Sequence, residues 1–439
     1  MLKRKGFKYR IYPNQEQTQR LRVQFGHARY VYNHFRALRD ETYQESPSKG
    51  RESGKGLSYT RTTALLQRLK QEPNYSWLKE GDSQVLQQSL KDLGRAYENW
   101  FRMCREGKRP SNKGKPPRKD GKPRGYPRFK SRHGAQSIRY PQRFKLKDSQ
   151  LYLTKVGWVK IVVHRPLAGE MKNCTVSTPV LVPTGASGTK SGKFYVSLQC
   201  ELEQDDPQPR PGQVGIDLGL VDFVTTSEGE KVVAPKYLRR GEQRIKRRQR
   251  CLSRKQKGSK NREKARQRLA VVHERVANQR RDFHHQLSHD LVDRYGTIAI
   301  EDLNIQGMVR NGKLAKSISD AGWGQFLRFL RYKAEWSGGE ILNVDRFFPS
   351  SKLCSECGEQ HQALKLSERQ WVCLSCGVLH DRDTNAAINI LKATTAGAAE
   401  SPSEGRESNA CGDTNLVGGS AQEADVLIST APLVRCSRG

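Results

Sequence analysis

Three acidic residues lie in surroundings that are unusual for a carboxylate. Asp217 stands inside the apolar run VGIDLGL, Glu301 ends the apolar run TIAI, and Asp383 opens a helix of small residues. A buried carboxylate is costly unless a cation or hydrogen-bond donors satisfy it. One such residue is usually just hydrogen-bonded, but three that converge repel one another, and two hard divalent cations held by oxygen ligands relieve that repulsion. We predict a catalytic site of these three acids with two Mg²⁺ or Mn²⁺ ions, which activate water against a phosphodiester.

A second set of chemically active residues consists of four cysteines in two pairs. Cys354 and Cys357 form one Cys-x2-Cys pair, and Cys373 and Cys376 form the other, 15 residues further on. This spacing is typical of a four-thiolate zinc ribbon with one structural Zn²⁺. Disulfide bonds are the alternative, and a reducing cytosol makes them the weaker one. His361 and His380 lie close enough to compete as ligands, but four thiols already complete a tetrahedron.

The overall charge indicates the kind of partner. The 439 residues contain 79 Lys and Arg against 45 Asp and Glu, a net charge of +34, and 35% are hydrophobic. A surplus this large indicates a polyanionic partner, and nucleic acid is the simplest. We find no apolar run long enough to cross a bilayer and no signal-peptide core. We therefore expect no membrane partner and a cytoplasmic, nucleoid-associated location in a bacterium or archaeon.

Two segments concentrate the positive charge. Residues 105–130 hold 11 Lys and Arg against two acids, among repeated Pro and Gly, and residues 236–268 hold 16 against two. A solvated linker is the alternative for the first segment, but its charge favours a loop that grips phosphates. The candidate nucleic-acid contacts are Lys115, Arg118 and Lys119 in the first segment and Arg239, Arg240, Arg244, Lys246, Arg247, Arg248 and Arg250 in the second.

Hydrophobic periodicity predicts a multidomain α/β protein. Period-two alternation indicates strands at 6–12, 158–164, 175–183 and 193–203, which suit a β-barrel or sandwich. Helical periodicity follows Asn14 and Asp82. Further along, strands at 214–234, 297–303 and 341–349 and helices near 323–330 and 383–391 place the three acids in the order of an RNase H-like sheet. Residues 394–439, which are acidic and of low complexity, predict a disordered tail.

Several motifs resemble those of the TnpB (OrfB) proteins of bacterial insertion sequences. KYRIYPNQEQ, GWVKIVVHRPL, GIDLGL, IAIEDLNIQGM, FPSSKLCSECG, the paired cysteines and HDRDTNAAINIL occur in that order over about residues 1–393. Within these motifs the catalytic acids carry over to Asp217, Glu301 and Asp383, in preference to the neighbours Asp302 and Asp381. The resemblance also implies kinship with type V CRISPR effectors.

The resemblance implies a domain plan and a function. The plan is a first strand of a β-barrel wedge domain at 1–13, a helical recognition domain at 14–134, the rest of the wedge at 135–204, a RuvC-like nuclease domain at 213–350 with its final helix at 380–393, and a zinc ribbon at 351–379. The implied function is an RNA-guided endonuclease that cleaves double-stranded DNA with a transposon-encoded guide RNA. A DNA-joining transposase and a nuclease-inactive guided repressor are the alternatives, and the oligomeric state stays open.

Overall fold

The fold was examined in a computed structural model. It describes residues 2–45, 57–107, 121–132, 134–178, 180–182, 189–190, 193–203, 207–365 and 367–399. The predicted contacts Lys115, Arg118 and Lys119, and the predicted tail from residue 400 onward, lie outside these residues. The described chain divides into two compact units, one of residues up to 203 with 258–271 and one of residues 207–257 with 272–399.

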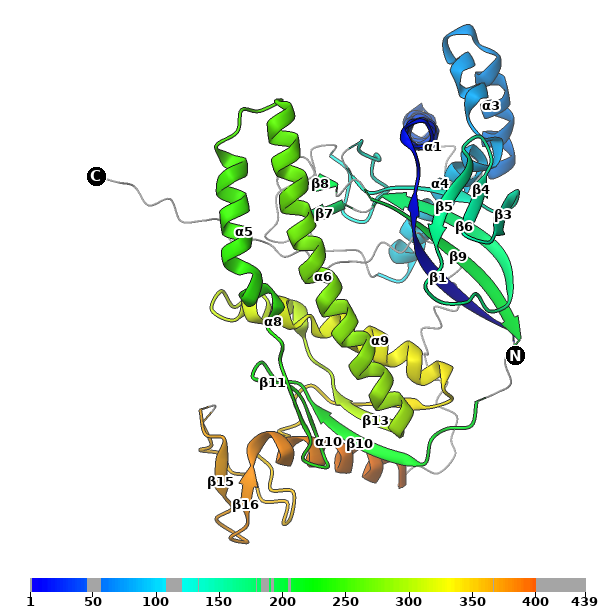
Figure 1. Ribbon diagram of the computed structural model, residues 1–439. Helices are drawn as coiled ribbons and strands as arrows, with labels where there is room; N and C mark the ends of the chain where they lie inside the picture. The colour runs from blue at the N-terminus through cyan, green and yellow to red at the C-terminus, as the bar shows by residue number, and fades with distance from the viewer. Residues whose placement is uncertain are drawn as a thin grey trace. The chain divides into compact units, whose positions relative to one another are not determined.

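The first unit is built on a seven-stranded antiparallel sheet (Figure 1). Its order is β2 (Gln136–Tyr140), β6 (Glu170–Thr178), β9 (Phe194–Glu203), β1 (Leu2–Tyr12), β5 (Gly157–Val162), β4 (Gln150–Leu153) and β3 (Phe144–Lys147). Phe7, Tyr9 and Ile11 of β1 are buried, as their alternation predicts. The predicted strand at 175–183 is wrong at both ends, because β6 begins at Glu170 and the separate strand β7 (Val180–Val182) pairs with β8 (Thr189–Lys190).

Helices complete this unit. They are α1 (Gln15–Glu45), α3 (Tyr59–Gln71), the 3-10 helix η1 (Pro73–Glu80) and α4 (Ser83–Arg105). Asn14 and Asp82 begin α1 and α4 as expected, since each side chain accepts hydrogen bonds from main-chain N–H groups of the first turn. The apolar faces of α1 and α4 pack on each other through Tyr32, Phe35, Leu86 and Leu90.

The second unit holds a five-stranded sheet that carries two of the predicted acids. Its order is β12 (Lys231–Val233), β11 (Asp222–Thr226), β10 (Gly212–Asp217), β13 (Tyr295–Glu301) and β14 (Glu340–Val344). The strands β10, β13 and β14 run parallel, whereas β10, β11 and β12 form antiparallel hairpins. The predicted strand at 341–349 ends early, at Val344, because the Asp345 side chain accepts a hydrogen bond from Phe347 N and starts a turn.

Helices cover both faces of this sheet (Figure 1). Val214 and Ile216 of β10 pack with residues of α6 (Lys260–Arg294) and α9 (Trp323–Trp336). The opposite face receives α10 (Arg382–Ala399), and a Cβ on Gly215 would lie only 2.0 Å from the carbonyl oxygen of Ala387. Only glycine allows so close an approach of helix and strand.

The basic stretch forms helices, and the last helix runs into the segment predicted as a tail. The basic stretch 236–268 is split into α5 (Tyr237–Ser253) and the start of α6, and α6 runs on to Arg294. α10 continues through 394–399, residues that the sequence assigned to the tail, and the hydroxyls of Thr394 and Thr395 bond carbonyls one turn back. Short elements α7 (Ile305–Met308), α8 (Ala315–Ala321), β15 (Gln370–Val372) and β16 (Leu379–Asp381) complete the unit. No helix among the described residues is long and apolar enough to span a membrane.

Candidate functional site

Strand register places Asp217 beside Glu301. In the parallel pair β10–β13, Gly215 lies opposite Ala299 and Ile216 opposite Ile300. Asp217 and Glu301 are the next residues in this register and end their strands at the same edge of the sheet. Because strand side chains alternate, both acids share the face of Gly215 and Ala299, which is the face that α10 covers.

The third acid reaches this edge from α10. Asp383 lies in the first turn of the helix, one side of which is buried through Ala386, Ala387 and Ile390. These positions follow Asp383 by three, four and seven residues, so they share its side of the helix. Packing of this side on β10 and β13 therefore brings Asp383 to the strand ends.

The electrostatics show that the three carboxylates affect one another. Burial first, and then the charges of Asp383 and Glu301, raise the pKa of Asp217 to about 7. Burial also raises the pKa of Glu301. The raised pKa values mean that burial, and at Asp217 also the charges of the two other acids, disfavours the ionised carboxylates. Carboxylate oxygens with uncompensated charge are the donor set that suits a hard divalent cation such as Mg²⁺ or Mn²⁺.

An arginine that sequence reasoning missed contacts this set. Nη1 of Arg369 lies 3.0 and 2.8 Å from the two carboxylate oxygens of Asp383. Arg369 precedes β15, and its carbonyl accepts a hydrogen bond from Arg382 N, at the start of α10. Within the described chain the four cysteines lie close enough to hold one ion, whereas the three acids do not form so tight a group. No sequence motif marks Arg369, because its role depends on the pairing of β15 with β16.

The neighbouring acids are engaged elsewhere. Asp302 is bound by Arg346 at 2.5 Å. Asp381 accepts a hydrogen bond from Lys231 at 2.7 Å and caps α10 through Thr384 N. These bonds outweigh burial and lower the pKa of Asp381. The charges that raise the pKa of Asp217 are those of Asp383 and Glu301, not those of these two neighbours.

The raised pKa of Asp217 predicts a pH-dependent stability. In the unfolded chain this carboxyl ionises near pH 3.8, and in the fold near pH 7, so the folded state binds more protons between these values and loses stability as the pH rises through them. Asp217→Asn removes the charge, so it should stabilise the protein above pH 7 by up to about 4 kcal/mol and have little effect below pH 4. Thermal unfolding in buffer without added Mg²⁺ or Mn²⁺ at both pH values measures this. A variant that is less stable than the wild type at pH 8 would contradict the assignment.

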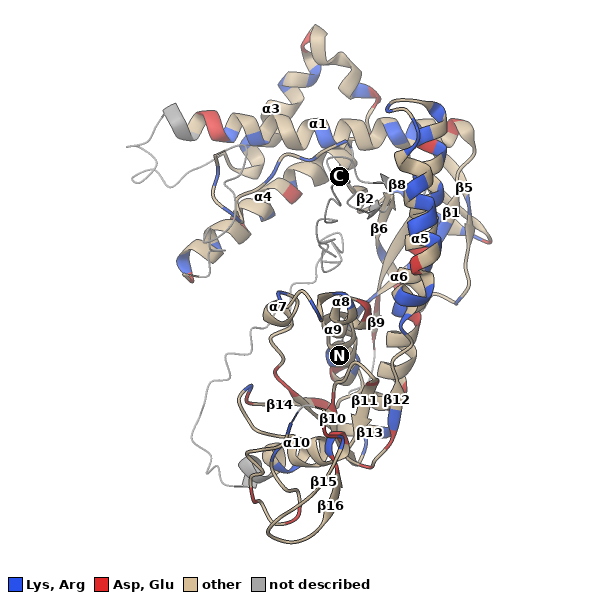
Figure 2. Ribbon diagram, turned by 90° about the vertical axis from the view of Figure 1, so that its left-hand side faces the viewer, with Lys and Arg blue, Asp and Glu red and all other residues tan. Residues whose placement is uncertain are grey.

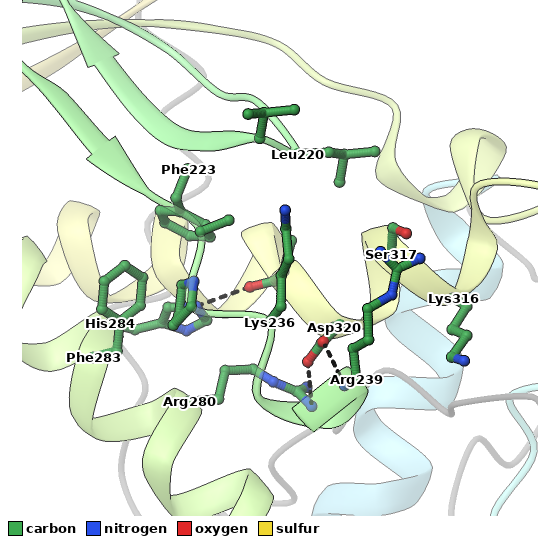
Figure 3. Close-up of a pocket in the computed structure, with 14 residues that line it drawn as sticks. Leu220, Phe223, Lys236, Arg239, Arg280, Phe283, His284, Lys316, Ser317 and Asp320 are labelled. Carbon is green, nitrogen blue, oxygen red and sulfur yellow. Dashed lines mark hydrogen bonds and ion pairs between the residues drawn. The ribbon is translucent and has the colours of Figure 1, made fainter. Parts of the chain in front are cut away.

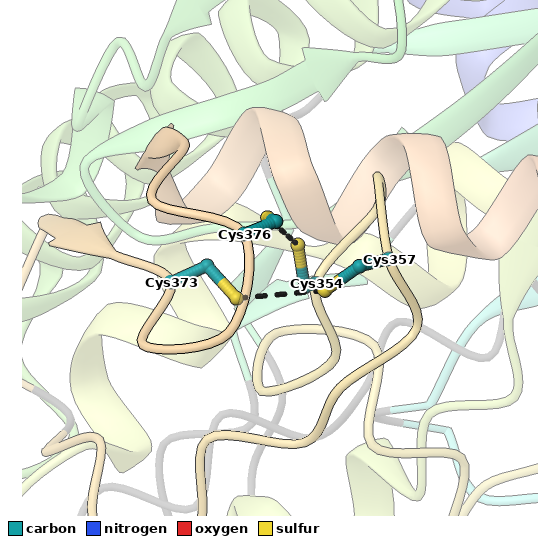
Figure 4. A group of neighbouring side chains, drawn as sticks. All are labelled: Cys354, Cys357, Cys373 and Cys376. Carbon is teal, nitrogen blue, oxygen red and sulfur yellow. Dashed lines mark hydrogen bonds between the residues drawn. The ribbon is translucent and has the colours of Figure 1, made fainter.

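The four predicted cysteines come together (Figure 4). One Sγ atom from each of Cys354, Cys357, Cys373 and Cys376 lies within 4.8 Å of the others. The Cys354–Cys376 and Cys357–Cys373 sulfur pairs are 3.6 Å apart, whereas a disulfide requires about 2.05 Å, so the disulfide alternative is wrong. Four soft thiols at these separations fit a tetrahedral Zn²⁺.

The two cysteine pairs are built alike. Cys354 N donates to Glu359 O and Cys373 N to Val378 O, which closes two equivalent turns. Gly358 and Gly377 occupy the same place in each turn with φ of 78° and 74°, a conformation that favours glycine. His380, which the sequence offers as a competing ligand, places Nε2 3.0 Å from Cys354 Sγ and so lies beside the four sulfurs.

Two buried asparagines tie the first cysteine turn to α10. Asn385 and Asn389 both donate from Nδ2 to Leu353 O, and Asn385 Oδ1 accepts from Ser355 N. The two side chains are 1% and 2% exposed, so these bonds are shielded from water. The cysteine cluster therefore helps to position the helix that carries Asp383. The two asparagines are visible in the sequence as NAAIN, but their bonds to the first cysteine turn become apparent only in the fold.

The basic helix α5 presents its charges to solvent. All seven of its predicted nucleic-acid contacts are exposed, and Ile245 is its buried residue. Figure 2 shows the Lys and Arg residues distributed along α5. Lys246 is paired with Glu242 at 2.9 Å. Such a face, with few acids to compensate it, suits a polyanion.

Comparison with known proteins identifies the family. The OrfB family model, described as a probable transposase, matches residues 197–312. A helix-turn-helix domain model matches 1–47, whose described part consists of β1 and α1, and the TNB domain of Cas12f1-like proteins matches 323–390.

Two bacterial relatives bear the name "Putative RNA-guided DNA endonuclease". That of Streptomyces pristinaespiralis is 39% identical over 402 residues, 90% of each chain. InsQ of Escherichia coli K12 is 32% identical over 411 residues, 90% of this chain and 93% of its own. The CRISPR-associated endodeoxyribonuclease Cas12f1 of Sulfoacidibacillus thermotolerans is 26% identical over 267 residues, 56% of this chain and 59% of its own. The chain belongs to the TnpB (OrfB) family, related to type V effectors.

Proposed function

We propose that this protein is an RNA-guided DNA endonuclease of a transposable element, which cleaves double-stranded DNA with its second unit. The observation that carries the proposal is the convergence of Asp217, Glu301 and Asp383 at one sheet edge. The names of the two bacterial relatives support the same activity. Guide RNA and target DNA are polyanions, which the net charge of +34 suits.

The second unit is proposed to be the RuvC-like nuclease domain. The proposal is supported by the strands β10 and β13 and the helix α10, which carry the three acids at the same end of the sheet. When bound there, two Mg²⁺ or Mn²⁺ ions supply an activated water and stabilise the leaving oxygen of a phosphodiester. The chain's own part is to hold three carboxylates on rigid elements, and α10 orients Asp383 through its packing on β10.

Arg369 neutralises Asp383 in the metal-free chain. A guanidinium that contacts both oxygens of Asp383 competes with a cation for the same atoms. We therefore expect Arg369 to leave Asp383 when the divalent ions bind, and to become available to a phosphate of the DNA strand.

The other parts follow the plan that the resemblance implies. The sheet of the first unit, with β1 contributed by residues 1–13 and the remainder by 135–204, is proposed as the barrel-shaped wedge domain, and 14–134 as the recognition domain. The four cysteines at 351–379 are proposed to bind one structural Zn²⁺. The basic helix α5 is proposed to contact RNA phosphates, and the protein to work at the nucleoid.

Salt should weaken RNA binding strongly. If phosphates are the main contact, affinity falls as cations compete, by roughly 10³-fold or more between about 50 and 200 mM salt. Fluorescence anisotropy with labelled single-stranded RNA over this range measures the slope. A flat profile would mean that the charge surplus serves a purpose other than phosphate contact.

The experiment that tests the activity uses the chain with RNA expressed from the same element and a supercoiled plasmid target. Linearised plasmid in Mg²⁺, and none in EDTA, is the expected result. Tight plasmid binding without a cut would favour the guided repressor, and joined products would favour the transposase.

A further inference from the structure

A cavity of about 200 Å³ opens in the second unit, apart from the three acids (Figure 3). Its walls come from the β10–β11 hairpin, the start of α5, the middle of α6, and α8. The hairpin contributes Leu220 and Phe223, which belong to the core formed with α6 and α9. Asp217 faces α10 on the other side of the sheet, so the cavity is a separate site.

The inner wall of the cavity is aromatic. Phe223 is fully buried, with its ring edge-to-face against Phe283 at 5.1 Å and stacked with His284 at 5.3 Å. Phe283 is only partly buried and lines the opening together with Leu220. Because Phe223 and His284 are covered by their neighbours, the ring of Phe283 supplies the open aromatic surface of the cavity. A volume of about 200 Å³ suits one ring system, because a drug-sized ligand would need a larger one.

The rim carries a surplus of positive charge. Lys236, Arg239, Arg280 and Lys316 line the cavity, against one carboxylate, that of Asp320. The carboxylate of Asp320 caps α5, because it accepts hydrogen bonds from Leu238 N at 2.9 Å and Arg239 N at 3.3 Å. It also lies 4.0 Å from Arg280. The rim therefore keeps a net attraction for an anion.

Two rim cations are not engaged by the protein. Among the described residues, the side chains of Lys236 and Arg239 form no hydrogen bond or ion pair. Lys236 also has a left-handed backbone, with φ of 50° and ψ of 45°, which costs free energy for a residue with a Cβ. Strain of this kind persists where the fold imposes it, often at functional sites.

We propose that this cavity binds one unpaired nucleotide of the RNA partner. An apolar aromatic wall beside several cations is the chemistry that accepts a splayed-out base together with its phosphate. Arg239 belongs both to the rim and to the exposed basic face of α5, so a strand that follows this helix meets the cavity at its first turn. The inference rests on the proposed function, because it needs an RNA partner.

The test blocks the cavity in the full chain. Ser317→Trp fills it from α8, and Lys236→Gln with Arg239→Gln removes the two unengaged cations from exposed positions, where the fold tolerates the change. Arg247→Gln with Arg248→Gln removes the same charge from α5 away from the cavity. Each protein is irradiated with single-stranded RNA that contains 4-thiouridine, and nucleotide adducts are located by mass spectrometry.

Wild type should carry adducts in residues 220–223, 283 or 316–320. Both cavity variants should lose these adducts and bind the RNA roughly 10-fold more weakly. The Arg247/Arg248 control should lose affinity through charge alone and keep the adducts.

Two outcomes would overturn the proposal and are distinguishable. RNA binding by the wild type with adducts only outside the cavity, or unchanged adducts in Ser317→Trp, refutes the cavity and leaves the proposed function standing. Absence of any RNA binding by the wild type refutes the proposed function itself.

Discussion

Asp217→Asn should abolish DNA cleavage while the protein still folds and binds RNA. The substitution keeps the shape of the side chain at the end of β10 but removes one anionic oxygen ligand from the site. The loss expected for a group that acts in the chemical step is roughly 10³-fold or more in cleavage rate. Cleavage of a guided plasmid target under single-turnover conditions measures the loss, and RNA affinity measured in parallel shows that folding is intact.

Asp302→Asn is the matched control. Asp302 directly follows Glu301, is exposed, and is held by Arg346 at the surface. The Asp302→Asn variant should therefore cleave DNA at close to the wild-type rate. Substitution of Asp383 by alanine should behave as Asp217→Asn does. Cleavage that survives Asp383→Ala would show that the third acid is misassigned and would direct the search to Asp381.

Cys373→Ser should remove zinc and unfold the segment around the cysteines. In a module of this kind the free energy of metal binding is also the free energy of folding. The apparent binding free energy of structural zinc sites is about 10–16 kcal/mol. Cleavage should fall as a consequence, because Asn385 and Asn389 tie the first cysteine turn to the helix that carries Asp383. Zinc stoichiometry by elemental analysis and proteolysis at 351–380 measure the two effects.

Cys251→Ser provides the control for the zinc experiment. Cys251 is an exposed free thiol on α5, remote in sequence from the two pairs. Its loss should leave the zinc content at one ion per chain. Full cleavage activity by a zinc-free Cys373→Ser protein would contradict a structural role for the metal.

Local patterns allowed much of the fold to be predicted. Alternation in β1 and the apolar stripes of α1 and α4 are set by side chains that each element buries, so they are visible along the sequence. Asp217 and Glu301 could be selected as candidates from the sequence, because each interrupts or ends an apolar run that predicts a buried strand. The cysteine turns repeat a spacing that zinc chemistry fixes.

Other features depend on contacts between distant segments. Arg369 lies at Asp383 only because β15 pairs with β16, which leads into α10. The end of β14 depends on one side chain, Asp345, that turns back on the main chain. The cavity at α5 is formed by four elements from distant parts of the sequence. Hydrophobic periodicity predicts single elements and therefore could not predict this cavity.

The most direct test of the central claim is to change the guide. The protein is expressed with RNA from its own element, the segment of that RNA that pairs with the target is replaced, and plasmids matching the old and new segments are incubated with the complex in Mg²⁺. We predict that cleavage moves entirely to the plasmid that matches the new segment, and that Asp217→Asn cuts neither plasmid. Cleavage that ignores the change in RNA sequence, or persists in Asp217→Asn, would contradict the account.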